Sequence, residues 1–273
     1  MSSRVRTIVA IAVAALLGLG AWRLFVHSGN LVKPALITPS MSAHDALSPD
    51  LSARVDRLIH EREEANRTGR PKLIALTFDD GPYPVFTPLL LAELRALRVR
   101  ATFFLIGRDA EQWPELTARI HADGEEIADH TYSHPDLDTE TDAQVRAELI
   151  KGRDTLLRLA PDESERTLMR PPHGRFTEAT VKVAQAMGYQ VVLWTDDSGD
   201  WRTLTAAEIR DHVDEHATAP DIVLLHSGKL ATIEALPGVV ARFRKAGYTF
   251  VTAGRLIRTV PAEQINHPAR RPV

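Results

Sequence analysis

The chain has 273 residues, of which 44% are hydrophobic and 25% charged, a composition typical of a globular protein. Its 33 Lys and Arg residues against 36 Asp and Glu residues give a formal net charge of -3, which argues against a nucleic acid as partner. Because the sequence has no cysteine, it excludes a thiol nucleophile, a thiolate metal site and disulfide bonds.

The first 26 residues have the pattern of an export signal. Arg4 and Arg6 precede an apolar run, Thr7–Trp22, and snorkelling of Arg23 lets the apolar stretch continue to Val26, close to the length of a membrane span. Bulky residues stand where a cleaved signal would be small and polar, so we expect a retained membrane-anchor helix rather than a cleaved signal peptide. The basic N-terminus predicts that the following residues lie outside the cytoplasm, in the periplasm or at the cell surface, and that they are secreted if the signal is cleaved.

Two segments flank a central domain. Residues 27–70 contain prolines, serines and a charged stretch with little apolar periodicity, and they indicate a stalk or linker. Residues 71–257 alternate β-rich runs with helical patterns and form the predicted folded domain. Residues 258–273 hold three prolines without a pattern, and we expect a disordered tail.

Seven β-rich runs in the central domain are separated by helical patterns. Gly124, Gly188 and Gly247 each stand between a helical stretch and the next run, as a left-handed helix end requires. Parallel strands with helical crossovers predict an α/β fold, a distorted and incomplete (β/α)7-type barrel that follows the N-terminal membrane-anchor helix, and an open doubly wound sheet is the competing topology. The predicted strands are Lys72–Phe78, Ala101–Ile106, Glu126–His130, Thr167–Arg170, Gln190–Thr195, Asp221–His226 and Tyr248–Val251.

Polar residues of reactive types follow five of these strands. In a βα barrel the C-terminal ends of the strands meet at one rim, where catalytic residues collect. We therefore expect these side chains to share one site. They are Asp79 and Asp80 after the first strand, His130 and His134 after the third, Arg170 after the fourth, Asp196 and Asp197 after the fifth, and His226 after the sixth.

This set of residues suits a divalent metal. Without cysteine, imidazole and carboxylate remain as ligands for a first-row ion, and His130 and His134 are the obvious pair. Pro135 disfavours a helical conformation at His134, so we expect a loop to carry the pair. One of the two adjacent aspartates completes a site with open positions. The other points a different way in an extended chain and faces the bound water as general base.

A rival motif lies further along the chain. His212-Val213-Asp214-Glu215-His216 has the H-x-x-E-H form of an inverted zinc protease motif, on a helix that Thr205 and Glu208 open with a capping box. The interleaved charges of Asp211 and Asp214 instead indicate the solvated side of a barrel helix. The composition of the segment therefore favours a structural helix over a protease.

Five short motifs occur in order along the central domain. They are Thr77-Phe78-Asp79-Asp80-Gly81-Pro82, His130-Thr131-Tyr132-Ser133-His134, Arg170-Pro171-Pro172-His173-Gly174, Asp197-Ser198-Gly199-Asp200-Trp201 and Leu224-Leu225-His226. Together they resemble the motifs of the polysaccharide deacetylases of carbohydrate esterase family 4, the NodB homology family. The resemblance covers roughly residues 71 to 257. One position departs from the family pattern, because His173 stands where the family often has Tyr.

The resemblance implies a role for each matching residue. Leu224 would line a small pocket for the acetyl methyl group, Trp201 would form a wall of the sugar groove, and the backbone N–H of His173 would face the oxyanion. By this resemblance the metal ligands are Asp80, His130 and His134. Asp79 is the general base, with Arg170 paired to it, and His226 is the general acid, positioned by Asp200. The substrate-binding residues are Pro172, His173, Gly174, Trp201 and Leu224.

The function that the resemblance implies is metal-dependent removal of N-acetyl groups from N-acetylhexosamine units of an extracytoplasmic polysaccharide. Peptidoglycan, a chitin-like polymer and poly-N-acetylglucosamine all fit this description. The base and the acid would act on a water molecule bound to a divalent ion, zinc first and cobalt or another first-row ion next, and no organic cofactor is needed. Two alternatives stay open: an O-acetyl xylan esterase on the same fold, and a catalytically silent glycan-binding protein.

Overall fold

The computed structural model describes residues 72–161, 167–216 and 219–260. The predicted anchor over residues 1–26, the stalk over 27–70 and the tail beyond Val260 lie outside these ranges. Within them, no helix combines the length and the apolar character that crossing a membrane requires.

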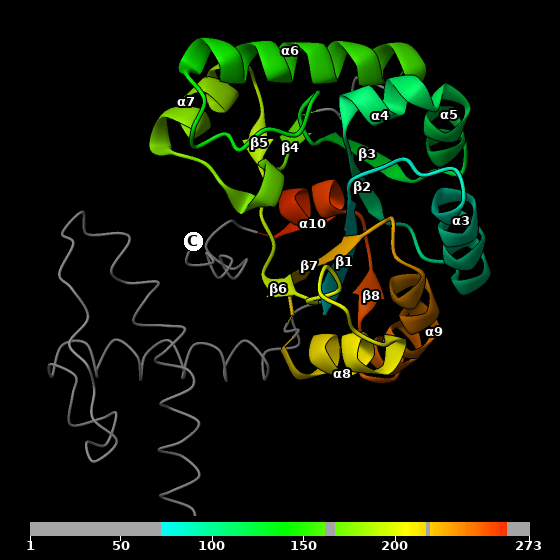
Figure 1. The fold of residues 1–273 in the computed structure, drawn as a ribbon. Helices are drawn as coiled ribbons and strands as arrows, with labels where there is room; N and C mark the ends of the chain where they lie inside the picture. Colours follow the sequence, from blue (N-terminus) through cyan, green and yellow to red (C-terminus); the bar gives the residue numbers. More distant parts are fainter. Residues whose placement is uncertain (1–71, 162–166, 217–218, 261–273) are drawn as a thin grey trace, which may run out of the picture. The chain divides into compact units, whose positions relative to one another are not determined.

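Strands and helices alternate along the described chain, as the sequence predicts (Figure 1). The strands are β1 (Leu73–Asp79), β2 (Thr102–Leu105), β3 (Glu126–Asp129), β4 (Leu168–Met169), β5 (Gln190–Val191), β6 (Asp196–Asp197), β7 (Asp221–His226) and β8 (Thr249–Phe250). The helices are α3 (Phe86–Leu97), α4 (Gly107–Gln112), α5 (Pro114–Ala122), α6 (Asp142–Leu159), α7 (Glu178–Ala186), α8 (Ala206–His216), α9 (Leu230–Lys245) and α10 (Ala253–Thr259). Helix α10 therefore continues two residues beyond the predicted end of the domain at Ile257.

The ends of several helices follow the signals in the sequence. Gly124, Gly188 and Gly247 have φ values of 81°, 85° and 83°, in the left-handed region where glycine is favoured. At the start of α8, Thr205 Oγ1 accepts from the Glu208 amide at 3.3 Å, and Glu208 Oε2 accepts from the Thr205 amide at 2.8 Å. The predicted capping box is therefore confirmed.

All strands pair in parallel, in the order β5-β4-β3-β2-β1-β7-β6, and β8 pairs with the start of β1. Strands β5 and β6 stand at opposite ends of this order, yet only residues 192–195 join them. Because an extended chain covers at most about 3.5 Å per residue, the two edges lie within roughly 18 Å of each other. The sheet is therefore curled into an incomplete barrel (Figure 1), and the open doubly wound sheet is excluded.

The predicted fifth strand, Gln190–Thr195, is shorter in the structure: β5 covers only Gln190–Val191, and a further short strand, β6, begins at Asp196, after the predicted end. The amide of Val192 donates to Met169 on the β4 side at 2.8 Å, whereas the amide of Thr195 donates to Ile222 on the β7 side at 2.9 Å. The segment changes its pairing partner as it crosses the open side of the barrel. Because of this change of partner, the described part of the chain has eight strands where the sequence predicts seven.

Alternate residues of each strand face the inside and the outside of the barrel. In β1, Leu73 and Ala75 belong to an inner core with Leu256 of α10, whereas Ile74 and Leu76 belong to a core shared with the surrounding helices. Helix α10 thus fills the end of the barrel where β1 begins. The inner positions at the other end of the strands are left for polar residues.

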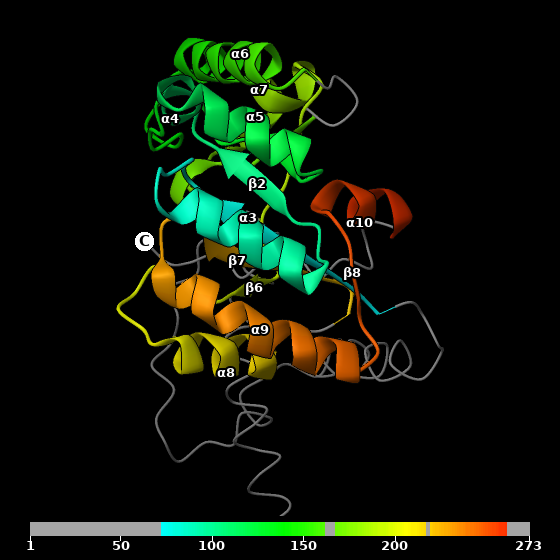
Figure 2. The same cartoon turned by 90° about the vertical axis from the view of Figure 1, so that its right-hand side faces the viewer.

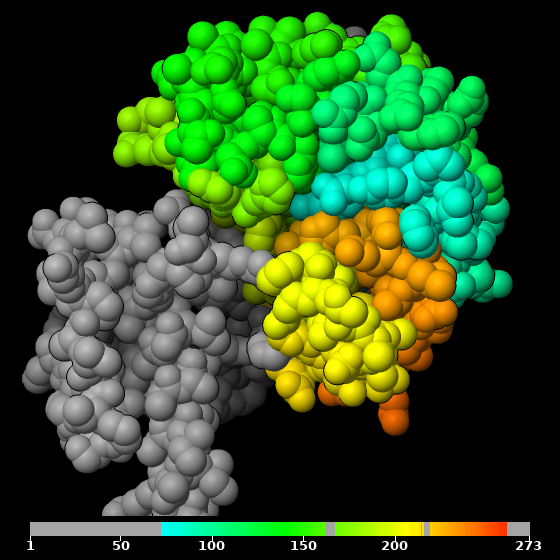
Figure 3. Space-filling model, viewed as in Figure 1, coloured from blue at the N-terminus to red at the C-terminus, as the bar shows by residue number. Residues whose placement is uncertain are grey.

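The helices form a ring around the curled sheet. Neighbours pack in the order α8, α9, α3, α5, α6 and α7, which follows the order of the strands. Helices α3 and α9 lie side by side in Figure 2. With all atoms drawn, the segments of α6, α3, α9 and α8 cover the outside of the strands (Figure 3). Because the outside is covered, the C-terminal rim is the part of the barrel open to a substrate.

Candidate active site

The register of two adjacent strands places two candidate catalytic residues side by side. β1 and β7 pair so that Asp79 is opposite His226 and Thr77 is opposite Leu224. Residues 77 and 79 follow the inner positions Leu73 and Ala75 in the alternation of β1. Asp79 and His226 therefore project from the last inner position of each strand into the rim of the barrel.

A pocket of about 310 Å³ opens at this rim. Its lining combines carboxylates and imidazoles, which can hold a metal and transfer protons, with two indole rings. The lining residues are Asp79, Asp80, His130, His134, His173, Gly174, Trp194, Asp197, Trp201, Leu224, His226 and Lys229.

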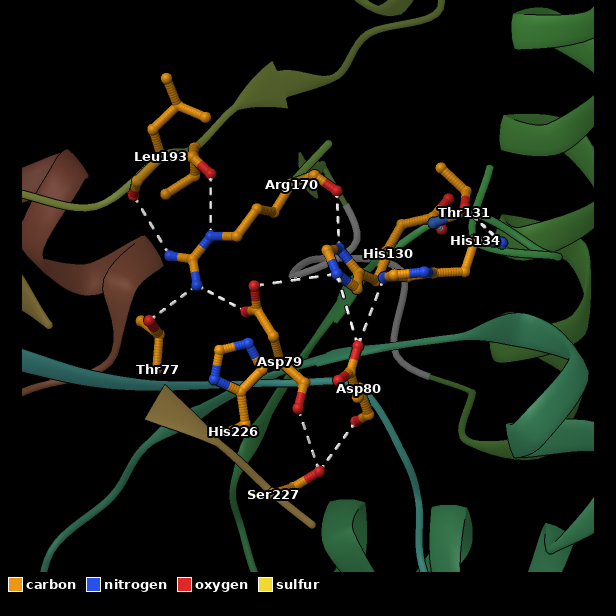
Figure 4. A network of polar contacts seen from close by, with 12 residues as sticks. Thr77, Asp79, Asp80, His130, Thr131, His134, Arg170, Leu193, His226 and Ser227 are labelled. Atoms are coloured by element: carbon orange, nitrogen blue, oxygen red, sulfur yellow. Dashed lines mark hydrogen bonds and ion pairs between the residues drawn. The ribbon is translucent and has the colours of Figure 1, made fainter. Parts of the chain in front are cut away.

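Arg170 lies beneath the pocket with a fully buried side chain. Its Nη1 donates to Asp79 Oδ1 at 2.6 Å and to Thr77 Oγ1 at 2.9 Å. Its Nε and Nη2 donate to the carbonyls of Val192 and Leu193 at 3.1 and 3.2 Å, in the segment that leaves the sheet (Figure 4). The Arg170 guanidinium thus compensates the charge of Asp79 and fixes the orientation of that carboxylate. It also donates hydrogen bonds to two backbone carbonyls at the open side of the barrel.

Asp80, His130 and His134 form a candidate metal site. Their ligand atoms all lie within 4.8 Å of one another, with Asp80 Oδ1 at 3.4 Å from His134 Nε2 and 3.8 Å from His130 Nε2 (Figure 4). His130 Nδ1 is 2.8 Å from the carbonyl oxygen of Arg170. Because a carbonyl only accepts, Nδ1 carries the proton and the lone pair of Nε2 is free for an ion. This donor set fits a divalent first-row metal.

The protonation states also suit a metal. Burial lowers the pKa of His130, which keeps its imidazole neutral as a ligand must be. Burial would raise the pKa of Asp80, but the hydrogen bond with His134 and the electrostatic effect of the surrounding histidines outweigh burial and lower it to about 2. An anionic carboxylate and a neutral imidazole, those of Asp80 and His130, therefore face the same point.

The backbone at this site departs from regular structure. Asp80 and His134 have φ values of 70° and 64°, and residues 130–134 form a loop after β3 rather than a helix. The loop expected from Pro135 is thus confirmed. The left-handed turn at Asp80 ends the alternation of β1 and sends this side chain toward the two histidines, away from Asp79.

Asp200 holds His226 in place. Asp200 Oδ1 is 2.7 Å from His226 Nδ1, and Oδ2 accepts from the His226 amide at 2.7 Å and from Thr232 Oγ1 at 2.6 Å. Burial would lower the pKa of His226, but the hydrogen bond and charge of Asp200 outweigh burial and raise it to about 9. The imidazole is therefore protonated at neutral pH and can donate a proton.

The candidate substrate-binding residues lie at different depths. Leu224 is buried in the wall of the pocket, and Trp201 is 42% exposed at its rim, where its indole N–H donates to Asp197 Oδ1 at 3.2 Å. Gly174 has a φ of 65°, and a Cβ there would come within 2.7 Å of Trp194. Pro172 is buried and does not line the pocket.

His173 lies next to the candidate metal site and contacts His134. Its φ is 55°, and its ring meets that of His134 edge to face, with 4.6 Å between the centroids. Its Nδ1 is 2.7 Å from Asp136 Oδ1, and the other oxygen of Asp136 accepts from Arg175 at 2.8 Å. The departure from the family's Tyr is thus accommodated by a local ion-pair network.

The predicted rim residue Asp196 does not line the pocket, and neither does His212 of the rival H-x-x-E-H motif. Asp196 pairs with Val223, an outer position of β7, so it lies on the outer face of the barrel with a buried side chain. His212 lies on α8 in the outer ring of helices and does not line the pocket. Among the residues whose side chains are described, Asp80, His130 and His134 are the one group that gathers three ligands.

Sequence reasoning missed three residues that matter to the site. Lys229 and Trp194 line the pocket, and Glu148 on α6 contacts the loop of the two histidines. The place of Lys229 at the rim could have been predicted, because Lys229 lies three residues after His226 and therefore follows the same strand, β7. Nothing in the spacing of Glu148 distinguishes it from the other charged residues of α6.

Several known proteins are similar to this chain in sequence and in structure. The family model "Polysaccharide deacetylase" matches residues 66–192. A peptidoglycan-N-acetylglucosamine deacetylase of Bacillus cereus is 37% identical over 192 residues, which are 68% of this chain and 89% of that protein. The peptidoglycan-N-acetylmuramic acid deacetylase PdaA of Bacillus subtilis is 33% identical over 207 residues, 74% of this chain and 78% of that protein. The crystal structure of the Bc1960 peptidoglycan N-acetylglucosamine deacetylase is 34% identical with a TM-score of 0.67, covering 70% of this chain and 90% of that chain.

The fold and the site define a hydrolase of the βα-barrel class that acts on carbon–nitrogen bonds other than peptide bonds. The chain belongs to the polysaccharide deacetylase family, carbohydrate esterase family 4. This family assignment excludes the protease suggested by the H-x-x-E-H motif as the chain's main activity.

Proposed function

We propose that the protein is a metal-dependent de-N-acetylase of peptidoglycan that acts on N-acetylhexosamine units outside the cytoplasm. The observation that carries the proposal is the geometry of the pocket. A carboxylate held by a buried arginine, a protonated imidazole and a candidate metal site all face one space of about 310 Å³. The relatives from Bacillus cereus and Bacillus subtilis, named as peptidoglycan deacetylases, support the choice of polymer.

Asp79 acts as the general base. Its Oδ2 is 3.7 Å from His130 Nε2, so the carboxylate stands next to the metal ligands, while Oδ1 is fixed by Arg170. The free oxygen takes the proton from the water molecule that attacks the acetyl carbonyl. A divalent ion held by Asp80, His130 and His134 would polarise that carbonyl and lower the pKa of the water.

His226 acts as the general acid. Nδ1 is held by Asp200, so Nε2 is the atom that presents a proton to the departing sugar amine. Amide hydrolysis needs this step because an amine is a poor leaving group until it is protonated. The backbone N–H of His173 donates to the oxyanion of the tetrahedral intermediate, a contribution of about 3 kcal/mol for a well-aimed donor.

Lys229 favours a polymer that carries carboxylates. It is exposed at the rim of the pocket, and within the described part of the chain no carboxylate pairs with it. The other charged side chains of the pocket lining have partners: Asp79 pairs with Arg170, Asp80 with the two histidines and His226 with Asp200, and Asp197 accepts hydrogen bonds from Gly199 and Trp201. An unpaired cation at the rim suits the carboxylates of peptidoglycan better than neutral chitin or acetylxylan.

The same proposal includes the location of the enzyme. Residues 1–26 would hold it at the cell membrane as an uncleaved anchor, and residues 27–70 would carry the catalytic domain toward the polymer. This placement supplies a reason for an export signal on a deacetylase of an extracytoplasmic glycan.

Acetate release by the purified full chain in detergent tests the function. We expect release from peptidoglycan glycan strands, loss of activity with a chelator, and recovery on adding Zn²⁺ or Co²⁺. Asp79→Asn should lower kcat by at least about 100-fold, because the base is lost while the pocket keeps its shape. Asp211→Asn, on an exposed residue of α8, is the matched control and should behave as the wild type.

Three outcomes would contradict the proposal. Acetate release from acetylxylan alone would indicate the O-acetyl esterase. Glycan binding by metal-loaded protein without any acetate release would indicate a silent binding protein. Activity of Asp79→Asn equal to that of the control would show that Asp79 is not the base.

A further inference from the structure

The loop between the two candidate metal-ligating histidines has no regular backbone pairing of its own. Thr131 and His134 have φ values of 66° and 64°, so the chain turns twice in four residues. Such a loop needs partners for its backbone amides, because a buried amide without a hydrogen bond costs free energy. Side-chain oxygens provide those partners at all four positions from 131 to 134.

Two short contacts fix the ends of the loop. The Thr131 amide donates to Asp129 Oδ1 at 2.8 Å, and the His134 amide donates to Thr131 Oγ1 at 3.1 Å. Asp129 is itself fully buried, and its other oxygen accepts from the Tyr189 hydroxyl at 2.6 Å. The first half of the loop is therefore tied to the outer face of β3.

One carboxylate fixes the middle of the loop. Glu148 Oε2 accepts from the amides of Tyr132 and Ser133 at 3.1 and 2.7 Å, and Oε1 accepts from Ser133 Oγ at 2.8 Å. Three donors from two adjacent residues thus converge on one half-buried side chain. Both oxygens of the Glu148 carboxylate accept hydrogen bonds. A Gln side chain has only one oxygen that can accept.

Helix α6, which carries Glu148, is held in place by close packing against its neighbours. The neighbouring Val145 and Leu149 are buried against α7 and β4, and Gly152 lets α6 come so close that a Cβ would lie 2.6 Å from Asp129 Oδ1. The helix therefore cannot shift relative to β3 without disturbing this packing. A carboxylate on such a helix holds the loop in one position.

We propose that Glu148 is a positioning residue for the metal: together with the start of α4, whose Gly107 and Arg108 amides donate to the carbonyls of Thr131 and Tyr132, it fixes the Tyr132–Ser133 backbone so that His134 faces Asp80. The inference rests on the proposed metal site. His134 Nε2 is the ligand atom closest to Asp80, at 3.4 Å, and His134 is bonded directly to Ser133. A residue that orients a ligand typically changes metal affinity by about 10- to 100-fold when it is replaced.

Metal binding to the apo full chain tests this role. Glu148→Gln keeps the size of the side chain but removes its negative charge, so the charge-assisted hydrogen bonds to the Tyr132 and Ser133 amides become weaker neutral ones. We expect the Kd for Zn²⁺, measured by competition with a chromophoric chelator, to rise about 10- to 100-fold. The visible absorption bands of bound Co²⁺ should shift as well, because the geometry around the ion changes.

Two further variants separate positioning from stability. Asp154→Asn, on the exposed side of α6 with a side chain that is 66% exposed, is the matched control and should bind both ions as the wild type does. Ser133→Ala removes only the contact with Oε1 and should raise the Kd by a few-fold. If circular dichroism shows Glu148→Gln to be unfolded, Ser133→Ala decides the question.

The outcomes are distinct. A folded Glu148→Gln variant whose Zn²⁺ affinity and Co²⁺ spectrum match the wild type would overturn the inference, even if its Tm were lower, because the residue would then be only structural. Unchanged metal affinity of Ser133→Ala would overturn it in the case where Glu148→Gln does not fold. A wild-type chain that binds neither ion would instead refute the proposed metal site itself.

Discussion

Asp79 and Asp80 are neighbours of the same residue type in different environments. Asp79 is the last residue of β1, faces the barrel interior and forms an ion pair with buried Arg170. Asp80 follows with a positive φ, is partly exposed and faces His130 and His134. The end of one strand therefore separates a carboxylate suited to proton transfer from one suited to a metal.

Lys229 gives a prediction about substrate preference. We expect Lys229→Gln to lower kcat/KM about 5-fold on carboxylate-bearing peptidoglycan strands, mainly through a higher KM, because one exposed ion pair contributes at most about 1 kcal/mol. On neutral chitotetraose the variant should equal the wild type. The preference of the wild type should also weaken at 0.5 M salt, since the contact is exposed to solvent.

Two forms of the peptidoglycan substrate and a control variant make the Lys229 prediction specific. Strands freed of peptide expose the carboxylate of the lactyl ether, whereas strands with peptides carry carboxylates on the peptide, so the two substrates show which group is bound. Lys245→Gln at the far end of α9 is the matched control. Equal losses of Lys229→Gln on peptidoglycan and chitotetraose would show that Lys229 binds sugar hydroxyls instead.

At the scale of the elements, regular features could be predicted and long-range contacts could not. Asp79, His130 and His226 stand at strand ends, and parallel strands necessarily bring such residues to one rim. The change of pairing partner within residues 190–195 depends on Arg170, whose side chain donates hydrogen bonds to the carbonyls of Val192 and Leu193. No local sequence pattern indicates this contact. The contact of Glu148 with the loop likewise depends on how closely α6 packs on β3.

The close packing of α6 on β3 predicts an unusual effect of an alanine. In a helix interior, Gly→Ala normally stabilises by about 1 kcal/mol. At Gly152 the added Cβ would lie 2.6 Å from Asp129 Oδ1, which is buried and bound to the Thr131 amide and therefore cannot withdraw. We expect Gly152→Ala to lower the free energy of unfolding by about 1–3 kcal/mol in urea titrations.

Gly238 in α9 provides the matched control for this effect. A Cβ there would lie 2.7 Å from Cδ of Arg210, part of a flexible side chain that can move away. Gly238→Ala should therefore be neutral or stabilise by up to about 1 kcal/mol. Equal effects of the two substitutions would show that the space between α6 and β3 does not limit the side chain at position 152.

At the scale of the whole described structure, two of the carboxyl groups buried on the outer face of the barrel, those of Asp129 and Asp196, have strongly raised pKa values. Burial raises the pKa of Asp129 to about 7, although the hydrogen bond from Tyr189 opposes the rise. Burial and the charges of Asp221 and Asp197 raise the pKa of Asp196 to about 8, and one oxygen of Asp196 has no hydrogen-bond partner within the described structure. Both groups are therefore most easily accommodated in their protonated form.

The buried carboxyl groups make stability depend on pH in a definite direction. In the unfolded chain an Asp loses its proton near pH 3.9, so from about pH 4 to pH 8 the folded state holds protons that the unfolded state has lost. These two carboxyl groups lower the free energy of unfolding as the pH rises through this window, whereas His130, whose pKa is lowered by burial, acts in the opposite direction up to about pH 6.5. His226, with its pKa raised to about 9, acts in the same direction as the two carboxyl groups, because its stabilising effect is complete below about pH 6.5 and is lost as the pH approaches 9.

Thermal unfolding of the chelator-treated full chain checks this direction without interference from metal release. We expect the Tm to be highest near pH 5 and to fall by about 5 °C or more by pH 9, since 1 kcal/mol corresponds to about 2–4 °C in a domain of this size. Asp196→Asn cannot ionise, so it should match the wild type near pH 5 and exceed it at pH 9, whereas the exposed control Asp211→Asn should follow the wild type throughout. A Tm that is constant from pH 5 to pH 9, or an Asp196→Asn variant with the same slope as the wild type, would mean that the buried carboxylate of Asp196 is compensated by a partner and does not titrate with unfolding.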